Sequence, residues 1–266
     1  FNQPLNSWTT TSLQFTSSTF QNASSFNQPL DAWDTSNVVL ANSMFEDAIL
    51  FDQDIDSWDT SSMTATNSMF AGAIAYNQPL DSWDVSQVTN MSSMFARATS
   101  FNQPLNGWIT TSLTNSASMF EDAVSFNRPL DSWDVSQVSN AQNMFSGATT
   151  FNQPLNNWDT ASLTNASGMF RDALAFNQTL DLWDTGDVTT MNAMFFGATN
   201  FNGAVNGWDT SRVTDMRSMF FGAASFDRPV GSWNTAMVVD MRQMFSGASS
   251  FNQPLNTWNT AMVTDM

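Results

Sequence analysis

The chain has 266 residues, with 24 acidic side chains, seven Arg and no Lys, His or Cys, and its net charge is −17. Without Cys and His it can form no disulfide and no thiolate or imidazole metal site, and it lacks the commonest general base. The negative charge argues against nucleic acid or an anionic membrane as a partner, and no apolar run approaches the ~20 residues that span a bilayer.

Aromatic residues recur every 25 residues without an insertion or deletion. All eleven Trp keep this step from Trp8 to Trp258, and one Phe series runs from Phe1 to Phe251 with Tyr76 as its only substitute. A fixed period of this length indicates stacked repeats that contact only their neighbours. We therefore predict one elongated domain over residues 1–266, with ten full repeats and a partial eleventh. We also expect the chain to be a segment of a longer protein.

The first half of each repeat predicts a short strand. Counting positions from the first Phe, position 4 is Pro in eight repeats and position 5 is always aliphatic, as in Pro104 and Leu105. Because Pro cannot donate to a sheet, it marks the start of a strand, and we expect positions 5–8 to pair in parallel with the next repeat. Position 2 is Asn in nearly every repeat, which favours an internal ladder of amides; a ligand-binding stripe is the alternative.

Asp forms two columns, at positions 6 and 9. Stacked carboxylates can hold calcium, whereas Asp at position 9 alone is explained by capping of a following helix. Like charges a few ångströms apart repel by about 1–4 kcal/mol per pair, and capping alone does not explain why the sequence stacks them. The calcium alternative rests on these residues: Asp31, Asp34, Asp56, Asp59, Asp81, Asp84, Asp131, Asp134, Asp181 and Asp184.

The second half of each repeat predicts a helix over positions 12–22. In the fourth repeat, Val88, Met91, Phe95 and Ala98 follow helical spacing. Gly at position 22 suits a helix end, and Ala at position 23 in every repeat indicates close packing between repeats. Met at position 19 is expected to fill the core.

Hydroxyl and amide side chains offer two further kinds of surface site. Thr at positions 10 and 14 could form exposed rows that face ice or a carbohydrate, although capping is the simpler explanation. Four N-x-S/T sequences make glycosylation candidates in a secreted eukaryotic protein. These are Asn22, Asn90, Asn165 and Asn177.

The run Trp83-Asp84-Val85-Ser86-Gln87-Val88-Thr89-Asn90-Met91, followed by Met94-Phe95 and Phe101-Asn102-Gln103-Pro104-Leu105, resembles the repeat of BspA-like leucine-rich-repeat surface proteins. The resemblance covers the whole chain. The repeat is also similar to the 25-residue repeat of mycoplasma-type surface lipoproteins. It implies a right-handed α/β solenoid with one short parallel strand and one short helix per repeat. It also implies display on a cell surface, with adhesion as the usual role. The first repeat departs from the pattern at Thr9, Phe15, Thr16 and Thr19.

Three functions follow as expectations. The leading one is a non-enzymatic, glycosylated extracellular protein that builds a fibre or surface layer by stacking end to end with copies of itself, since uncapped repeats expose edges. The second is a cell-surface adhesin that binds a protein or glycan through one face. The third is a calcium- or ice-binding module. No Ser-His-Asp triad or phosphate-binding glycine loop is present, and no cofactor other than calcium is expected.

Overall fold

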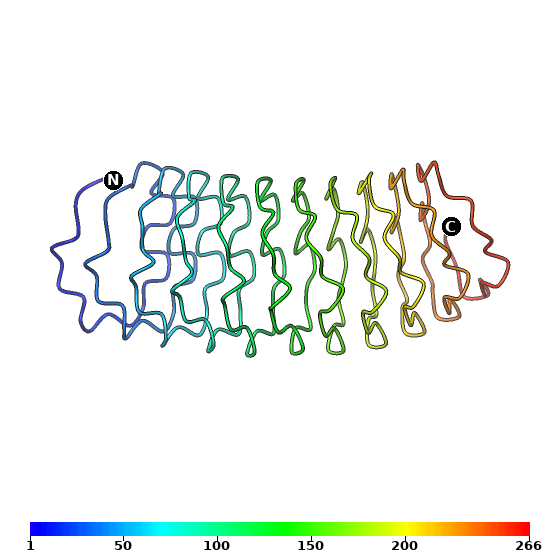
Figure 1. Cartoon of the computed structure of the whole chain (residues 1–266), viewed down its shortest axis with the longest axis horizontal. Coiled ribbons are helices and arrows are strands. Elements are labelled where there is room, and N and C mark those ends of the chain that lie inside the picture. Colours follow the sequence, from blue (N-terminus) through cyan, green and yellow to red (C-terminus); the bar gives the residue numbers. More distant parts are fainter.

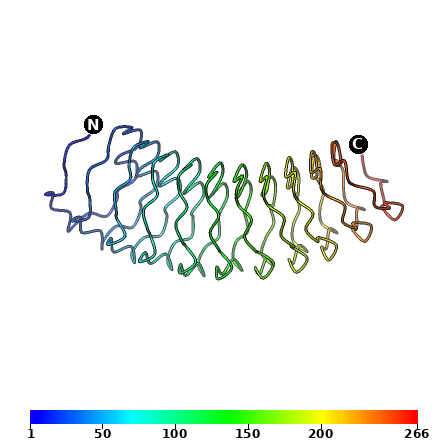
Figure 2. The ribbon, with the colours of Figure 1, turned by 45° about the horizontal axis from the view of Figure 1, so that its top comes forward.

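Each repeat forms one coil of an elongated stack in the computed structural model, which describes residues 1–266. Figure 1 shows the coils following one another along a single axis, with the two termini at opposite ends, and Figure 2 shows that the stack bows into a shallow arc. The apolar side chains merge into one core of 72 buried residues that runs from Leu5 to Met244. The predicted elongated repeat stack is confirmed.

The helix predicted over positions 12–22 does not form. The chain contains no helix at all, and so none that could cross a membrane. In the fourth coil, alternate backbone N–H groups donate to the next coil, as Phe95 N–H does to Met119 O at 2.9 Å. The N–H groups between them donate three residues back, as Met94 N–H does to Met91 O at 3.1 Å. The segment is therefore a run of tight turns.

Two positions in this run have left-handed backbone. Ser93 and Arg97, at positions 18 and 22, have φ of 57° and 59°, and the same two positions have positive φ in every complete coil. An α-helix needs φ near −60° at each residue, so the alternation cannot be helical. The residues that suggested a helix, Val88, Met91 and Phe95, are nevertheless all fully buried.

The parallel pairing lies at position 15 and not at the predicted positions 5–8. Single residues bridge neighbouring coils in parallel at every step, from Phe15–Leu40 to Asp240–Asp265, and no strand is longer than one residue. Positions 5–8 form a tight turn, in which Trp108 N–H donates to Leu105 O at 3.1 Å. The Leu105 carbonyl also accepts a hydrogen bond from the indole of Trp133 in the next coil, at 2.9 Å.

Aromatic rings fill the interior in continuous columns. Phe95 stacks on Phe101 of the following coil at 4.1 Å between ring centroids, and on Phe120 at 5.7 Å. Tryptophans of adjacent coils stack at 6.0 to 6.4 Å, as Trp208 does on Trp233 at 6.0 Å and Trp33 on Trp58 at 6.4 Å. The Met residues at position 19 are buried, which confirms their role as core filler, and the Ala residues at position 23 are buried in all coils but the first, where Ala23 is partly buried.

Candidate functional site

Asn at position 2 forms an internal ladder, as predicted. Asn77 Oδ1 accepts hydrogen bonds from the backbone N–H of Asn102, at 2.9 Å, and from the side chain of Gln103, at 3.1 Å. The same pairing joins Asn27 to Asn2 at the start of the stack. The amides therefore hold neighbouring coils in register, and their acceptor oxygens are occupied by the protein itself.

Asp at position 9 caps a turn, not a helix. The carboxylates of Asp34, Asp59, Asp84, Asp134 and Asp184 each accept the backbone N–H two residues on, at 2.9 to 3.1 Å. At Asp84 the Ser86 hydroxyl and then the Ser86 N–H hold the carboxyl pKa below its usual value of 3.8. Local capping is thus the observed role of this column.

Asp at position 6 binds the next coil or faces solvent. Asp56 accepts the backbone N–H of Ser82 at 2.9 Å, and Asp181 accepts that of Gly207 at 2.7 Å. Asp31 accepts the Asn6 side chain at 2.8 Å, while Asp81 and Asp131 are exposed.

Four carboxylates line one depression of about 700 Å³ on the surface of the second and third coils. Asp31, Asp56 and Asp59 were predicted as part of the two columns, and Asp54 was not. Asp54 stands at position 4, where most repeats have Pro, and this departure from the repeat is the signal that could have identified it. No Lys or Arg precedes Arg97 in the sequence, so the depression is strongly acidic.

No three of the acidic side chains converge in an arrangement that could hold a metal ion. The two Asp columns run along the stack, and most of the oxygens described above accept hydrogen bonds from the protein itself. Calcium binding therefore stays a prediction, which melting curves recorded with calcium and with a chelator would test.

The four glycosylation candidates differ in accessibility. Asn22 and Asn177 are exposed, although Asn177 Oδ1 accepts the backbone N–H of Asn202 at 2.7 Å. Asn90 and Asn165 are half-buried at the bridged position 15, and each accepts the N–H two residues on at 3.0 Å. Asn22 and Asn177 are therefore the accessible candidates, because the bridges at position 15 leave little room for a glycan on Asn90 or Asn165.

The two Thr rows also differ. Thr at position 10 is buried, and its hydroxyl donates to a carbonyl of the next coil, as Thr110 does to Asp134 O at 2.9 Å. The expectation of an exposed row at position 10 is therefore wrong, because these hydroxyls serve coil stacking. Most Thr at position 14 are exposed, and Thr114 donates to the Thr89 carbonyl at 3.0 Å.

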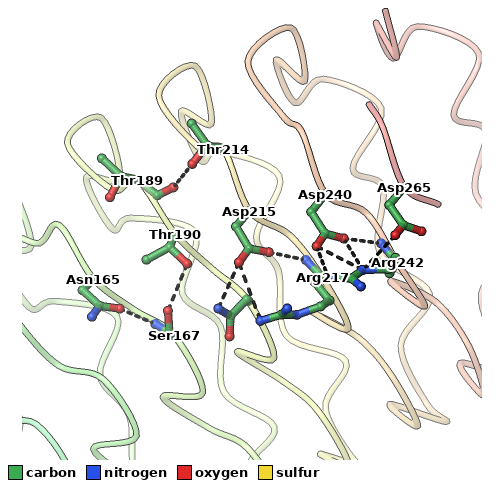
Figure 3. A network of polar contacts seen from close by, with 11 residues as sticks. Asn165, Ser167, Thr189, Thr190, Thr214, Asp215, Arg217, Asp240, Arg242 and Asp265 are labelled. Atoms are coloured by element: carbon green, nitrogen blue, oxygen red, sulfur yellow. Dashed lines mark hydrogen bonds and ion pairs between the residues drawn. The ribbon is translucent and has the colours of Figure 1, made fainter. Parts of the chain in front are cut away.

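A row of alternating charges follows positions 15 and 17 near the C-terminal end (Figure 3). Arg242 pairs with Asp240 at 2.7 Å and with Asp265 at 3.4 Å. Arg217 lies 3.9 Å from Asp215 of its own coil, the coil before that of Arg242. In the middle of the stack the same position 15 carries an uncharged Asn column, as at Asn165 in Figure 3. Of these ion pairs, only that of Arg242 with Asp265 joins two coils. In the Asn column, the side-chain nitrogen of Asn165 makes such a contact with Gln142 Oε1 of the preceding coil, at 3.3 Å.

Every coil has two chemically different edges. Backbone N–H groups at positions 18, 20 and 22 point to the following coil, and carbonyls at positions 17, 19 and 21 point to the preceding one. At the first coil the rings of Phe1, Trp8 and Phe15 are 56 to 65% exposed. Inside the stack, each coil thus offers carbonyl acceptors to the preceding coil and N–H donors to the following one.

No curated protein shows a significant match to the sequence. Among solved structures, the chain is similar to a leucine-rich repeat protein from Bacteroides ovatus ATCC 8483, with 13% identity, a TM-score of 0.41 and coverage of 85% of this chain and 68% of that one. It is also similar to the TLR13 chain of a TLR13–ssRNA13 complex, with 9% identity, a TM-score of 0.32 and coverage of 86% of this chain and 38% of that one. At these scores neither likeness bears on what this chain does.

One repeat family matches the sequence from end to end. It is described as Mycoplasma protein of unknown function, DUF285, and it matches residues 1–108, 75–183, 103–204 and 175–266. The overlapping segments together span all eleven coils, and they agree with the mycoplasma-type repeat that the motif around Trp83 predicted. The chain belongs to this DUF285 family of Mycoplasma proteins of unknown function.

Proposed function

We propose that this chain is a non-enzymatic, extracellular structural repeat protein that assembles through the edges of its coils into a fibre or surface layer. The observation that supports the proposal is the complementarity of the two edges. Donors at positions 18, 20 and 22 on one edge match acceptors at positions 17, 19 and 21 on the other. A head-to-tail contact of this kind generates a filament when its rotation does not close into a ring.

Apolar burial adds to the hydrogen bonds at such a contact. Phe15 is 63% exposed and Trp8 is 56% exposed, whereas Trp33 in the next coil is buried. Covering an aromatic side chain of this size stabilises a contact by roughly 1.5–3 kcal/mol. Each coil inside the stack packs its neighbour in this way, and the proposal is that copies of the protein make the same kind of contact.

Glycosylation is part of the proposal at the two exposed sites only. Asn22 and Asn177 are exposed, and neither side-chain nitrogen donates a hydrogen bond, so a glycan on the Asn177 nitrogen leaves the ladder bond to its Oδ1 in place. Glycosylation is tested separately by a glycan stain of the protein purified from its natural source. The stain is then repeated on the variants Asn22→Gln and Asn177→Gln.

Negative-stain electron microscopy of the purified chain tests the assembly. We expect filaments whose length grows with protein concentration. Phe15→Asp, which places a charge on the exposed edge of the first coil, should shorten or abolish them. Leu182→Asp is the matched control, because Leu182 is 68% exposed on a turn in the middle of the stack. Isolated arcs at every concentration would contradict the proposal.

A further inference from the structure

One corner of the coils carries a row of exposed aliphatic side chains. At position 24, Ile49, Ile74, Val124 and Leu174 are 36 to 44% exposed, in a chain whose other aliphatic columns are buried. The corner, defined as positions 21, 22, 24 and 25, follows the buried Ala at position 23. Its coils are held in register by hydrogen bonds from position 25 to the carbonyl at position 24 of the preceding coil. An example is the bond from Ala75 N–H to Ile49 O at 3.1 Å.

Charges on the same corner are confined to four coils. Positions 21 and 22 are acidic in coils 2 and 5, basic in coil 4, and of both signs in coil 7. These residues are Glu46 and Asp47, Glu121 and Asp122, Arg97, and Arg171 and Asp172. Coils 3 and 6 have only Ala71, Gly72, Ser146 and Gly147 there. The order of these charges along the stack determines how two copies can pair.

This charge pattern is complementary to itself when it is reversed. If two copies lay side by side in the same direction, each acidic pair would face the identical acidic pair of the second copy. In the opposite direction, a two-fold axis between coils 4 and 5 sets Arg97 against Glu121 and Asp122 of the second copy. It also sets Arg171 against Glu46 and Asp47, and it sets the uncharged coil 3 against the uncharged coil 6.

The exposed aliphatic row fits the same alignment. Ile49 and Leu50 in coil 2 then meet Leu174 in coil 7, and the two-fold repeats this contact at the other end. Val124 meets Thr99 near the axis. Apolar contacts flanked by opposite charges are the ordinary composition of a specific interface, and a contact between identical surfaces must be self-complementary.

We propose that this corner binds a second copy of the chain, antiparallel, about a two-fold axis between coils 4 and 5. Both arginines are already paired within their own copy, but each is about half exposed, so a second copy can reach it. Arg97 is 53% exposed and Asp47 is 43% exposed even though their own ion pair spans 3.3 Å. Arg171 and Asp172, each 49% exposed, pair with one another at 3.4 Å, and Arg171 also lies over the Phe196 ring at 4.7 Å, so the contact with Glu46 and Asp47 of the second copy must draw Arg171 away from these two groups. Lateral pairing would join two stacks side by side, whereas end-to-end stacking only lengthens a single stack.

Cysteine cross-linking tests the direction of pairing, because the chain has no Cys of its own. Ile49→Cys and Leu174→Cys are made as two separate proteins, and both positions are exposed. We expect a disulfide-linked dimer only when the two are mixed and oxidised. Dimers in either protein alone would indicate parallel pairing and overturn the proposal. Far-ultraviolet circular dichroism confirms that both variants are folded.

Sedimentation tests the charge register. Arg97→Glu should weaken dimerisation at least tenfold, and adding Glu121→Arg to it should restore most of the affinity. Arg128→Glu is the matched control, since Arg128 is an exposed arginine at position 3 whose Nε–H donates to a backbone carbonyl. A monomer at all concentrations, or a double variant no better than Arg97→Glu, overturns the proposal. Phe15→Asp separates the two assemblies: it should remove filaments and leave the lateral dimer.

Discussion

Asp47 and Arg97 form an ion pair although they lie two coils apart. Arg97 Nη2 lies 3.3 Å from Asp47 Oδ1, and the coil between them contributes Gly72 at the same position. A Cβ on Gly72 would lie 2.0 Å from Asp47 Oδ1 and 3.4 Å from Arg97 Nη2. The ion pair therefore closes over a residue that has no side chain, and this explains why Gly stands between the two charges.

Gly72→Ala should lower the free energy of unfolding by at least about 1–2 kcal/mol, because Gly72 has φ of 68° and the left-handed conformation costs Ala about that much. The new Cβ would also force Asp47 Oδ1, 2.0 Å away, to move. Urea unfolding followed by Trp fluorescence measures the change. Gly107→Ala is the control, since a Cβ on Gly107 meets nothing within 4 Å. Equal effects of the two substitutions would show that neither the backbone conformation of Gly72 nor its closeness to Asp47 affects stability.

Tyr76→Phe should stabilise the protein by about 1–3 kcal/mol. Its hydroxyl is buried and has no hydrogen-bond partner, which costs the folded state roughly that amount. Phe101→Tyr, one coil further along the same column, should destabilise by a similar amount. If Tyr76→Phe is destabilising instead, the hydroxyl has a partner, and nearby Asp54 is the first to test.

The same residue predicts alkaline sensitivity. Burial, and then the negative charges of Asp54, Asp52 and Asp56, raise the Tyr76 pKa well above its usual value of 10. A raised folded pKa contributes stability below the unfolded value, and this contribution is lost as the pH rises past it. The unfolding midpoint in urea should therefore fall above pH 10 by more in the parent protein than in Tyr76→Phe.

Trp108→Phe should destabilise the stack by about 1–3 kcal/mol. The indole N–H of Trp108 donates to Leu80 O of the preceding coil at 2.9 Å, and its loss leaves a buried carbonyl with one partner fewer. Trp8→Phe provides the comparison, because Trp8 is in the first coil and is 56% exposed. Thermal unfolding of the two variants should differ clearly, and a shared midpoint would contradict a role for the indole ladder.

Ser86→Ala should raise the Asp84 pKa towards 3.8, because the Ser86 hydroxyl is the main cause of its depression. A depressed folded pKa contributes stability above the unfolded value, and this contribution is lost as the pH falls through the folded one. The parent protein should therefore lose stability below about pH 4, and Ser86→Ala should lose less. Nuclear magnetic resonance titration of Asp84 measures the pKa, with Ser82→Ala as a control, since the Ser82 hydroxyl bonds Asp56.

Several features could be predicted because they depend only on the repeat. The period places each Trp and Phe over its copy in the next coil, and stacking identical residues makes the aromatic columns and the Asn ladder from Asn2 onwards. Burial of Val88, Met91 and Phe95 follows from their being apolar. Family membership was indicated by the motif around Trp83, whose residues can be read without any structure.

The local backbone was decided by contacts between coils, which a single repeat does not contain. Val88, Met91 and Phe95 have the spacing of a helix face, but their segment directs alternate N–H groups to the next coil and takes positive φ at Ser93 and Arg97. Spacing alone cannot distinguish this from a helix, because both bury the same residues. The pairing of Arg97 with Asp47 and the acidic depression around Asp54 likewise join residues from different coils. The sequence by itself thus determined the stack and its core, and only the tertiary structure decided how each coil turns and which charges meet.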